Sequence, residues 1–370
     1  MRFPEFSGEW KMCTIGELIT KVGSGVTPRG GEAVYKTEGH PFVRSQNVGL
    51  GNLLLDDIAF IDEETHLRQK NTELQFNDVL LNITGASIGR SALVDKQIVG
   101  GNVNQHVCII RTKENLVPSF ICSFLLSNYG QRQIDSFQAG GNRQGLNLNF
   151  EQIKSIKITI PSKDEQIKIA KLLRAIDERI ATQNKIIEKL QSLIKGIAQN
   201  VARNNKPNIR LSECLECSSS TLQESDVCKN GTYPVYGANG IVGYLDNYNT
   251  EKEAVYIIKD GSGVGTVSYV TGKCSATGTL NTLQAKEGYS LQYLYYMLKV
   301  FNFEPYKTGM AIPHIYFKDY GKAKIFCPSY TEQLKYARLL SAIDNKLSAE
   351  QSILTDLSLQ KQYLLRQMFI

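Results

Sequence analysis

Cysteine and glycine spacings are the first features of this sequence in which chemistry could reside. Cys214, Cys217 and Cys228 form a C-x-x-C pair with a third thiol eleven residues further on, which could supply part of a zinc site. A second C-x-x-C pair is missing, so small buried hydrophobic thiols are the favoured interpretation. The glycines of segment 261–265 lack the lysine and hydroxyl of a phosphate-binding loop, which favours a turn between strands.

The remaining candidates for catalysis are the histidines. They are isolated in the sequence and none has metal-ligand spacing: His40, His66, His106 and His314. No cysteine has an identifiable histidine partner, which disfavours a thiol-dependent hydrolase. We also find no motif for methyl transfer or strand cleavage. The sequence therefore predicts a binding protein with no catalytic residue and no metal site.

Composition sets the broad class. The chain has 370 residues, of which 42% are hydrophobic and 21% charged, a balance typical of globular proteins and unlike disordered chains or collagens. No apolar run reaches the roughly 18 residues of a membrane span, and the first residues form no apolar signal segment. The eight cysteines are scattered, without the spacing of a disulfide framework. We expect a cytoplasmic protein with reduced thiols and no membrane contact.

Twenty residues occur twice at an offset of 167. PSKDEQIKIAKLLRAIDERI spans 161–180, PSYTEQLKYARLLSAIDNKL spans 328–347, and 11 of the 20 positions are identical without a gap. Each copy follows an alternating apolar segment, then continues with proline and Ser-x-x-Glu, the capping box that begins a helix. The repeat therefore predicts a strand, a stop and a helix, twice.

Both predicted helices carry a heptad pattern over about 38 residues, or about 57 Å at 1.5 Å per residue. Gln183 and Glu350 are polar at equivalent positions of this pattern, and they could either fix the register or mark a solvated break. The apolar positions that we expect to form the seam are Leu173, Ile176, Ile180, Ile187, Leu190, Leu340, Ile343, Leu347, Leu354 and Leu357.

The region between the helices is too long for a loop and must be a lobe, whose two ends usually lie close together. The second helix can then bury its seam on the first only by running antiparallel to it. We predict an α+β fold with two mixed α/β lobes on two long coiled-coil helices and a pseudo-two-fold internal repeat. Segments 15–19 and 211–215 are similar, as are 85–89 and 261–265. The predicted domains are 1–160, 161–206, 207–328 and 329–370.

The repeated block, the opening residues 2–10 and the closing residues 360–369 resemble the DNA-specificity subunit of type I restriction-modification systems over essentially the whole chain. The resemblance implies a non-catalytic subunit for host defence, in which each lobe is a target-recognition domain for one half of a split, asymmetric DNA target. It implies helices that dock two adenine-methylating subunits, joined by motor-nuclease subunits. It also implies that S-adenosylmethionine, ATP and Mg belong to those partners, with no cofactor in this chain. The second lobe departs from the first in being shorter.

Bidentate-capable side chains in turns are our candidates for contacts with double-stranded DNA, because such groups recognise guanine and adenine edges. A polar solvated loop explains each cluster about as well. In the first lobe the candidates are Arg44, Gln46, Asn47, Asn142, Arg143 and Gln144. In the second lobe the candidates follow from position: Lys307 stands in the place of the Asn142 turn, and His314, Tyr316 and Lys318 come just after it.

The net charge of +6 falls entirely on segments 163–206 and 329–370, while both lobes are neutral. Neutral lobes indicate either that nucleic acid is not the ligand or that partner subunits supply much of the attraction to phosphate. The alternative hypothesis is therefore a coiled-coil scaffold that binds proteins without recognising a DNA sequence.

Overall fold

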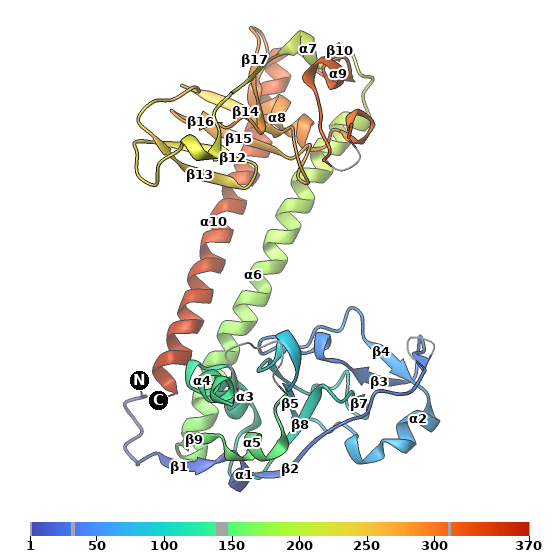
Figure 1. Cartoon of the computed structure of the whole chain (residues 1–370), viewed down its shortest axis with the longest axis vertical. Helices are drawn as coiled ribbons and strands as arrows, with labels where there is room; N and C mark the ends of the chain where they lie inside the picture. Colours follow the sequence, from blue (N-terminus) through green and yellow to red (C-terminus); the bar gives the residue numbers. More distant parts are fainter. Residues whose placement is uncertain (1, 31–33, 138–146, 310–311, 370) are drawn as a thin grey trace. The chain divides into compact units, whose positions relative to one another are not determined.

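The computed structural model describes residues 2–30, 34–137, 147–309 and 312–369. The chain divides into two compact units, one of residues 1–183 with 353–370 and the other of residues 184–352. Each unit contains one lobe and a part of both long helices, α6 (Lys163–Arg203) and α10 (Tyr330–Met368) (Figure 1). None of the described helices is long and apolar enough to cross a bilayer.

Lobe one is residues 1–160, and its described part contains three small sheets. A four-stranded sheet has the order β2-β8-β5-β6, a three-stranded sheet the order β4-β3-β7, and β1 pairs with β9. The strands are β1 (Lys11–Thr14), β2 (Ile19–Ser24), β3 (His40–Val43), β4 (Ala59–Ile61), β5 (Val79–Asn82), β6 (Ser91–Leu93), β7 (Asn102–Val103), β8 (Val107–Thr112) and β9 (Lys157–Ile160). The helices are α1 (Ile15–Leu18), α2 (Glu63–Arg68), α3 (Pro118–Leu126), α4 (Asn128–Ser136) and α5 (Phe150–Ser155).

Lobe two repeats this topology. Its sheets have the orders β11-β17-β14-β15 and β13-β12-β16, and β10 pairs with β18. The strands are β10 (Ile209–Arg210), β11 (Leu215–Ser219), β12 (Tyr233–Gly237), β13 (Gly240–Leu245), β14 (Glu253–Ile258), β15 (Val267–Thr271), β16 (Ser275–Ala276), β17 (Leu280–Ala285) and β18 (Lys324–Ile325). The helices are α7 (Leu211–Cys214), α8 (Leu291–Lys299) and α9 (Phe317–Tyr320).

The correspondence extends to individual pairings. In the three-stranded sheets, β3 pairs with β7 in parallel and β12 pairs with β16 in parallel, although the other described ladders are antiparallel. Leu18 and Cys214 close the equivalent short helices α1 and α7, and both are buried. Lobe one is longer because it adds α2, α4 and residues 44–58 between β3 and β4. Lobe two joins β12 to β13 through Ala238 and Asn239 alone.

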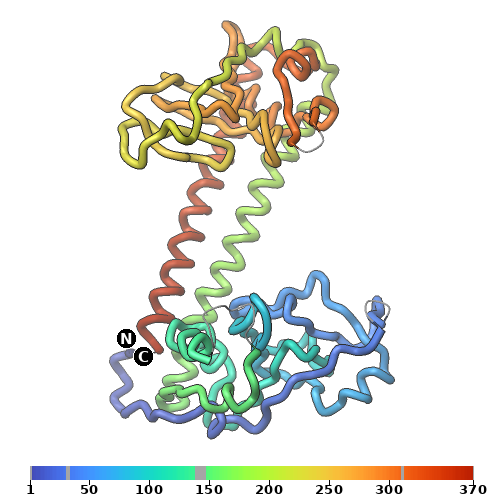
Figure 2. Tube along the Cα trace, in the orientation of Figure 1, coloured from blue at the N-terminus to red at the C-terminus, as the bar shows by residue number. Residues whose placement is uncertain are grey.

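The long helices run antiparallel within each unit. In the unit of lobe one, Ile169 and Leu173 of α6 share a core with Leu364 and Met368 of α10, and Asp177 pairs with Lys361. In the unit of lobe two, Ile194 and Ala198 share a core with Ala337 and Leu340. Residue numbers therefore rise along α6 in the direction in which they fall along α10. The predicted α+β class with two lobes, paired antiparallel helices and an internal repeat is confirmed (Figure 2).

The ten predicted seam residues are all at least partly shielded from solvent. Leu173, Ile176, Ile187, Leu340 and Leu357 are buried. The remaining five are half-buried: Ile180, Leu190, Ile343, Leu347 and Leu354. The polar heptad positions Gln183 and Glu350 are buried as well.

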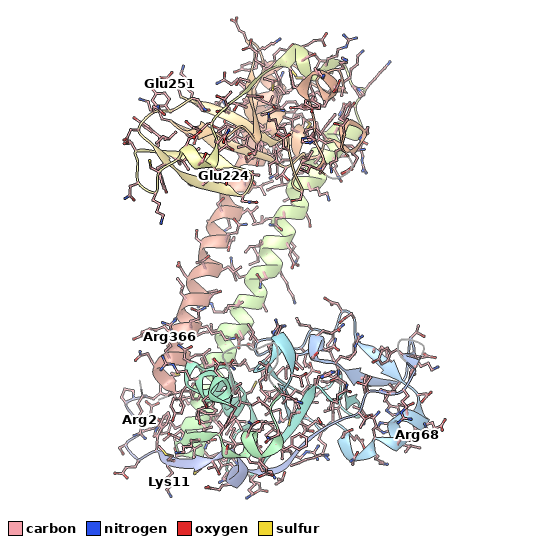
Figure 3. All side chains as sticks on the ribbon, in the orientation of Figure 1. Arg2, Lys11, Arg68, Glu224, Glu251 and Arg366 are labelled. Carbon is pink, nitrogen blue, oxygen red and sulfur yellow. The ribbon has the colours of Figure 1, made fainter. Side chains whose placement is uncertain are left out.

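The two copies of Ser-x-x-Glu begin their helices in different ways. The Ser162 hydroxyl accepts a hydrogen bond from the Glu165 N–H (3.4 Å), and the Glu165 carboxylate turns to Arg2, whose guanidinium donates to both of its oxygens at 2.9 Å. In the second copy the Ser329 N–H and hydroxyl donate to the Glu332 carboxylate (3.3 and 2.8 Å). Figure 3 labels Arg2 at the edge of the unit. The predicted capping motif is therefore used by its serine in one copy and by its glutamate in the other.

Candidate nucleic-acid interface

Each lobe has a glycine turn that joins the third and fourth strands of its four-stranded sheet. In lobe one the turn of residues 85–89 follows β5, and in lobe two the turn of residues 261–265 follows β14. The first and last glycines of both turns have positive φ, between +69° and +96°, a backbone conformation that residues with a side chain rarely adopt. The closing bond is the same: Gly89 N–H donates to Asn82 O and Gly265 N–H to Ile258 O, both at 2.9 Å. The turn therefore has the same backbone conformation in each of the two lobes.

A histidine pairs with the residue before the first glycine in each lobe. His106 Nδ1 lies 2.7 Å from the Thr84 hydroxyl, and His314 Nδ1 lies 2.7 Å from the Asp260 carboxylate. Thr84 and Asp260 occupy equivalent positions, but the histidines come from different parts of the lobes, since His106 precedes β8 and His314 precedes α9. A hydroxyl in one lobe therefore stands where a carboxylate stands in the other.

The structure brings together the four candidate residues of lobe two. Thr308, which follows Lys307, exchanges two backbone hydrogen bonds with His314 (2.9 and 2.7 Å). Tyr316 is 47% exposed, and Lys318 Nζ lies 5.2 Å from the centre of its ring. Lys307 Nζ is held by Glu304 at 2.6 Å. This loop offers donors, an exposed ring and a cation beside the turn of residues 261–265.

The first cluster of lobe one has a different character, because its side chains converge on Asp57. Arg44 Nη2 donates to the Asp57 carbonyl (2.7 Å), Asn47 Nδ2 donates to the Asp57 carboxylate (2.9 Å), and the Gln46 amide also bonds this carboxylate. The Arg44 side chain is half-buried and the Gln46 side chain is exposed. Their donors nonetheless already have an acidic partner.

Asn47 does not fit the predicted contact with a DNA base. It is fully buried, its Nδ2 also donates to Leu54 O (2.9 Å), and its Oδ1 accepts from the Arg44 N–H (2.9 Å). A side chain with these bonds would have to leave the interior and break them to contact DNA. The structure therefore gives Asn47 a role within its loop in place of the predicted base contact.

The second cluster of lobe one, Asn142, Arg143 and Gln144, lies outside the described residues. Asn147, which follows it in the chain, forms a β-bridge with Thr84. Sequence reasoning missed Thr84, His106 and Asp260. The signal was available, because aligning the glycines of segments 85–89 and 261–265 puts Thr84 and Asp260 in register.

The environment of the C-x-x-C cysteines in lobe two favours neutral thiols that pack in the lobe over metal ligands. The Cys214 thiol is buried and donates to Arg210 O and Leu211 O (3.5 and 3.4 Å). Burial raises the pKa of Cys214 to about 12 and that of Cys217 to about 11, which opposes the thiolate that zinc requires. Over the described part of the chain, no three His, Cys, Asp or Glu side chains are grouped so that they could hold a metal ion.

The two remaining histidines stack on each other in lobe one. The rings of His40 and His66 are 3.8 Å apart and 5° from parallel, and His40 Nε2 lies 2.6 Å from the Glu63 carboxylate. This hydrogen bond raises the pKa of His40 from its usual 6.5, and the same bond lowers the pKa of Glu63 from 4.5. The pair therefore links the stability of the β3–α2 contact to pH.

We expect the contribution of His40 to be complete below about pH 6.5 and to be lost as the pH rises through its raised pKa. The contribution of Glu63 is complete above about pH 4.5 and is lost as the pH falls through its lowered pKa. NMR titration of the His40 ring should give a pKa above 6.5 that falls in Glu63→Gln. A His40 pKa that does not respond to this substitution would contradict the assignment.

Comparison with known proteins places these features in a family. A family model described as the type I restriction modification DNA specificity domain matches residues 7–192 and again residues 207–358. A protein of Mycoplasma genitalium named as a type I specificity subunit is 26% identical over 322 residues, which cover 80% of this chain and 81% of that protein. The EcoprrI specificity subunit of Escherichia coli is 28% identical over 30% of this chain and 28% of its own.

Solved structures share the fold. The S subunit of a type I restriction-modification system from M. genitalium superposes with a TM-score of 0.67 at 18% identity, covering 100% of this chain and 99% of that one. A second structure, described as showing complex assembly and conformational transition of the type I system, has a TM-score of 0.57 at 16% identity and covers 98% and 97%. The duplicated lobe on paired helices is therefore an architecture that recurs among known structures.

Proposed function

The chain belongs to the family of type I restriction-modification DNA specificity subunits, and from this premise we propose that each lobe recognises one half of a split, asymmetric DNA target. One observation carries the proposal: the lobes share strand order and glycine turns, but differ in the side chains placed there, Thr84 with His106 against Asp260 with His314. Equivalent backbones would approach DNA in the same way. Different side chains would select different bases, because bases are distinguished by hydrogen-bonding pattern.

We further propose that the long helices dock two adenine-methylating subunits and, through them, motor-nuclease subunits. Large apolar side chains are exposed along α6 and α10, namely Ile186, Leu193, Leu339, Ile353, Leu359 and Tyr363. The net positive charge lies on the same helices. Docking on the helices would leave both lobes free for DNA. S-adenosylmethionine, ATP and Mg would belong to the partners, and this chain would supply recognition without catalysis.

Arg143→Ala should weaken recognition of one half-site only, by about 1–3 kcal/mol if its contact is bidentate. Lys318→Ala in lobe two is the matched variant for the other half-site. Binding by the assembled methyltransferase should be measured on DNA in which each half-site is scrambled in turn. An equal loss by Arg143→Ala on unrelated DNA would reassign this residue to phosphate contact, and indifference of the wild type to scrambling would favour the protein-binding scaffold.

A further inference from the structure

Each lobe is attached to its long helix by the same residue of the repeated block. Gln166 Oε1 accepts from the Val117 N–H (2.9 Å), and Gln333 Oε1 accepts from the Ser290 N–H (2.9 Å). Val117 and Ser290 are the residues that precede α3 and α8, so both glutamines hold the beginning of a lobe helix. Each side-chain amide also donates to the proline carbonyl of its own block. This is the first attachment point.

A second attachment point lies eleven residues further along each helix, or about 16 Å at 1.5 Å per residue. Asp344 of α10 accepts a hydrogen bond from the Tyr296 hydroxyl of α8 at 2.8 Å. Burial and the neighbouring carboxylate raise the pKa of Tyr296, which keeps the proton on its oxygen. Asp344 is therefore tied directly to lobe two through a neutral donor.

The equivalent residue, Asp177 of α6, is tied to lobe one through an ion pair. Lys361 Nζ of α10 lies 2.5 Å from Asp177 Oδ1 and 3.4 Å from the carbonyl of Leu50. Gly51 packs beside this pair with φ of +99°, and a Cβ there would lie 3.6 Å from both Asp177 Oδ2 and Lys361 Nζ. Lys361 occupies an otherwise apolar position of the heptad pattern, so its charge interrupts the seam where lobe one contacts the helices.

The loop that reaches Lys361 is specific to lobe one. It belongs to residues 44–58, which lobe two replaces by Ala238 and Asn239. The Gly51 N–H donates to Ser91 O of β6 (2.9 Å), and the bonds to Asp57 hold the start of the loop. These bonds fix the loop to the rest of lobe one. The contact of Lys361 with Leu50 therefore attaches the whole lobe to α10, not the loop alone.

We propose that Asp177 and Asp344 are positioning residues that set the tilt of each lobe on its helix, and thereby the separation of half-sites that the chain accepts. A single polar attachment leaves the tilt of a lobe to the apolar packing that it shares with the helices, whereas a second attachment about 16 Å further along a rigid helix restricts that tilt. A rotation of about 10° moves a group about 20 Å from the pivot by about 3.5 Å, which is close to the 3.4 Å rise of one base pair. This inference rests on the proposed function.

The experiment uses the full chain assembled with its methylating subunit and DNA that carries the cognate half-sites at the natural separation, one base pair closer or one base pair further apart. The variants Lys361→Met and Tyr296→Phe each remove one second attachment. We expect both to lower the preference in methylation rate for the natural separation by about threefold or more. Lys361→Arg keeps the charge and should restore the preference.

Arg68→Met is the matched control, because it removes an exposed ion pair with Glu64 within α2, a helix that contributes no residue to either attachment. Figure 3 labels Arg68. It should leave the preference unchanged. Circular dichroism melting establishes that each variant is folded. Folded Lys361→Met and Tyr296→Phe proteins that keep the wild-type preference would overturn the inference. Absence of methylation by the wild-type assembly would instead refute the proposed function.

Discussion

Replacing Arg111 with methionine is expected to destabilise lobe one by about 3 kcal/mol. Arg111 Nε and Nη2 donate to the two oxygens of Asp78 at 2.7 and 2.6 Å, and Asp78 is only 1% exposed. The substitution keeps the apolar part of the side chain but leaves a buried carboxylate without its bidentate partner, and the cost of that burial dominates. Denaturant unfolding followed by circular dichroism gives the change in the free energy of unfolding.

Two further variants isolate the electrostatic cause of this loss. Asp78→Asn in the Arg111→Met background removes the buried charge and should recover part of the stability, because a neutral amide costs less to bury. Arg68→Met removes an exposed pair and should change the stability by less than about 1 kcal/mol. If Arg111→Met unfolds like Arg68→Met, the buried pair does not stabilise lobe one.

Exchanging residues 15–160 for the lobe of a related subunit should change one half of the DNA target and leave the other half intact. Each mismatched base pair costs about 1–3 kcal/mol, so several changed pairs should reduce recognition of the original half by roughly a thousandfold or more. The exchange preserves Gln166 and α6, and the new lobe must supply a backbone N–H in the place of Val117. Methylation maps of the parent and the chimera provide the comparison.

The comparison decides whether the lobes act independently. A chimera that changes both half-sites would show that recognition depends on residues shared between the two units. A chimera that folds but is inactive would indicate that the new lobe does not form the hydrogen bond with Gln166. Gln166→Ala in the parent chain tests this explanation, because it removes the same bond and should also abolish activity.

The long helices are the part of the fold that can best be predicted from the sequence. The repeated block and the heptad pattern depend on local periodicity, and the structure has helices at Lys163–Arg203 and Tyr330–Met368. Strand order could not be predicted, because alternation identifies a strand without naming its partner. The parallel pairing of β3 with β7 is an example, since its residues Phe42 and Asn102 are far apart in the sequence.

The candidate interface was harder to predict for the same reason. Residue type alone grouped Asn47 with Arg44 and Gln46, but burial and the bonds to Leu54 and Asp57 separate it from them. The contact of Lys361 with Leu50 cannot be predicted from local patterns, because it joins residues 311 positions apart. Tertiary partners at such distances leave no local signature, whereas the two glycine turns do.

A methylation map would show directly whether the chain recognises a split DNA target. The chain is co-expressed with its cognate methylating subunit in a host free of DNA methylation, and modified adenines are located by sequencing. We expect a single split, asymmetric motif with one modified adenine in each half. Adenine methylation without a split motif, or no methylation from a complex that still assembles, would contradict it.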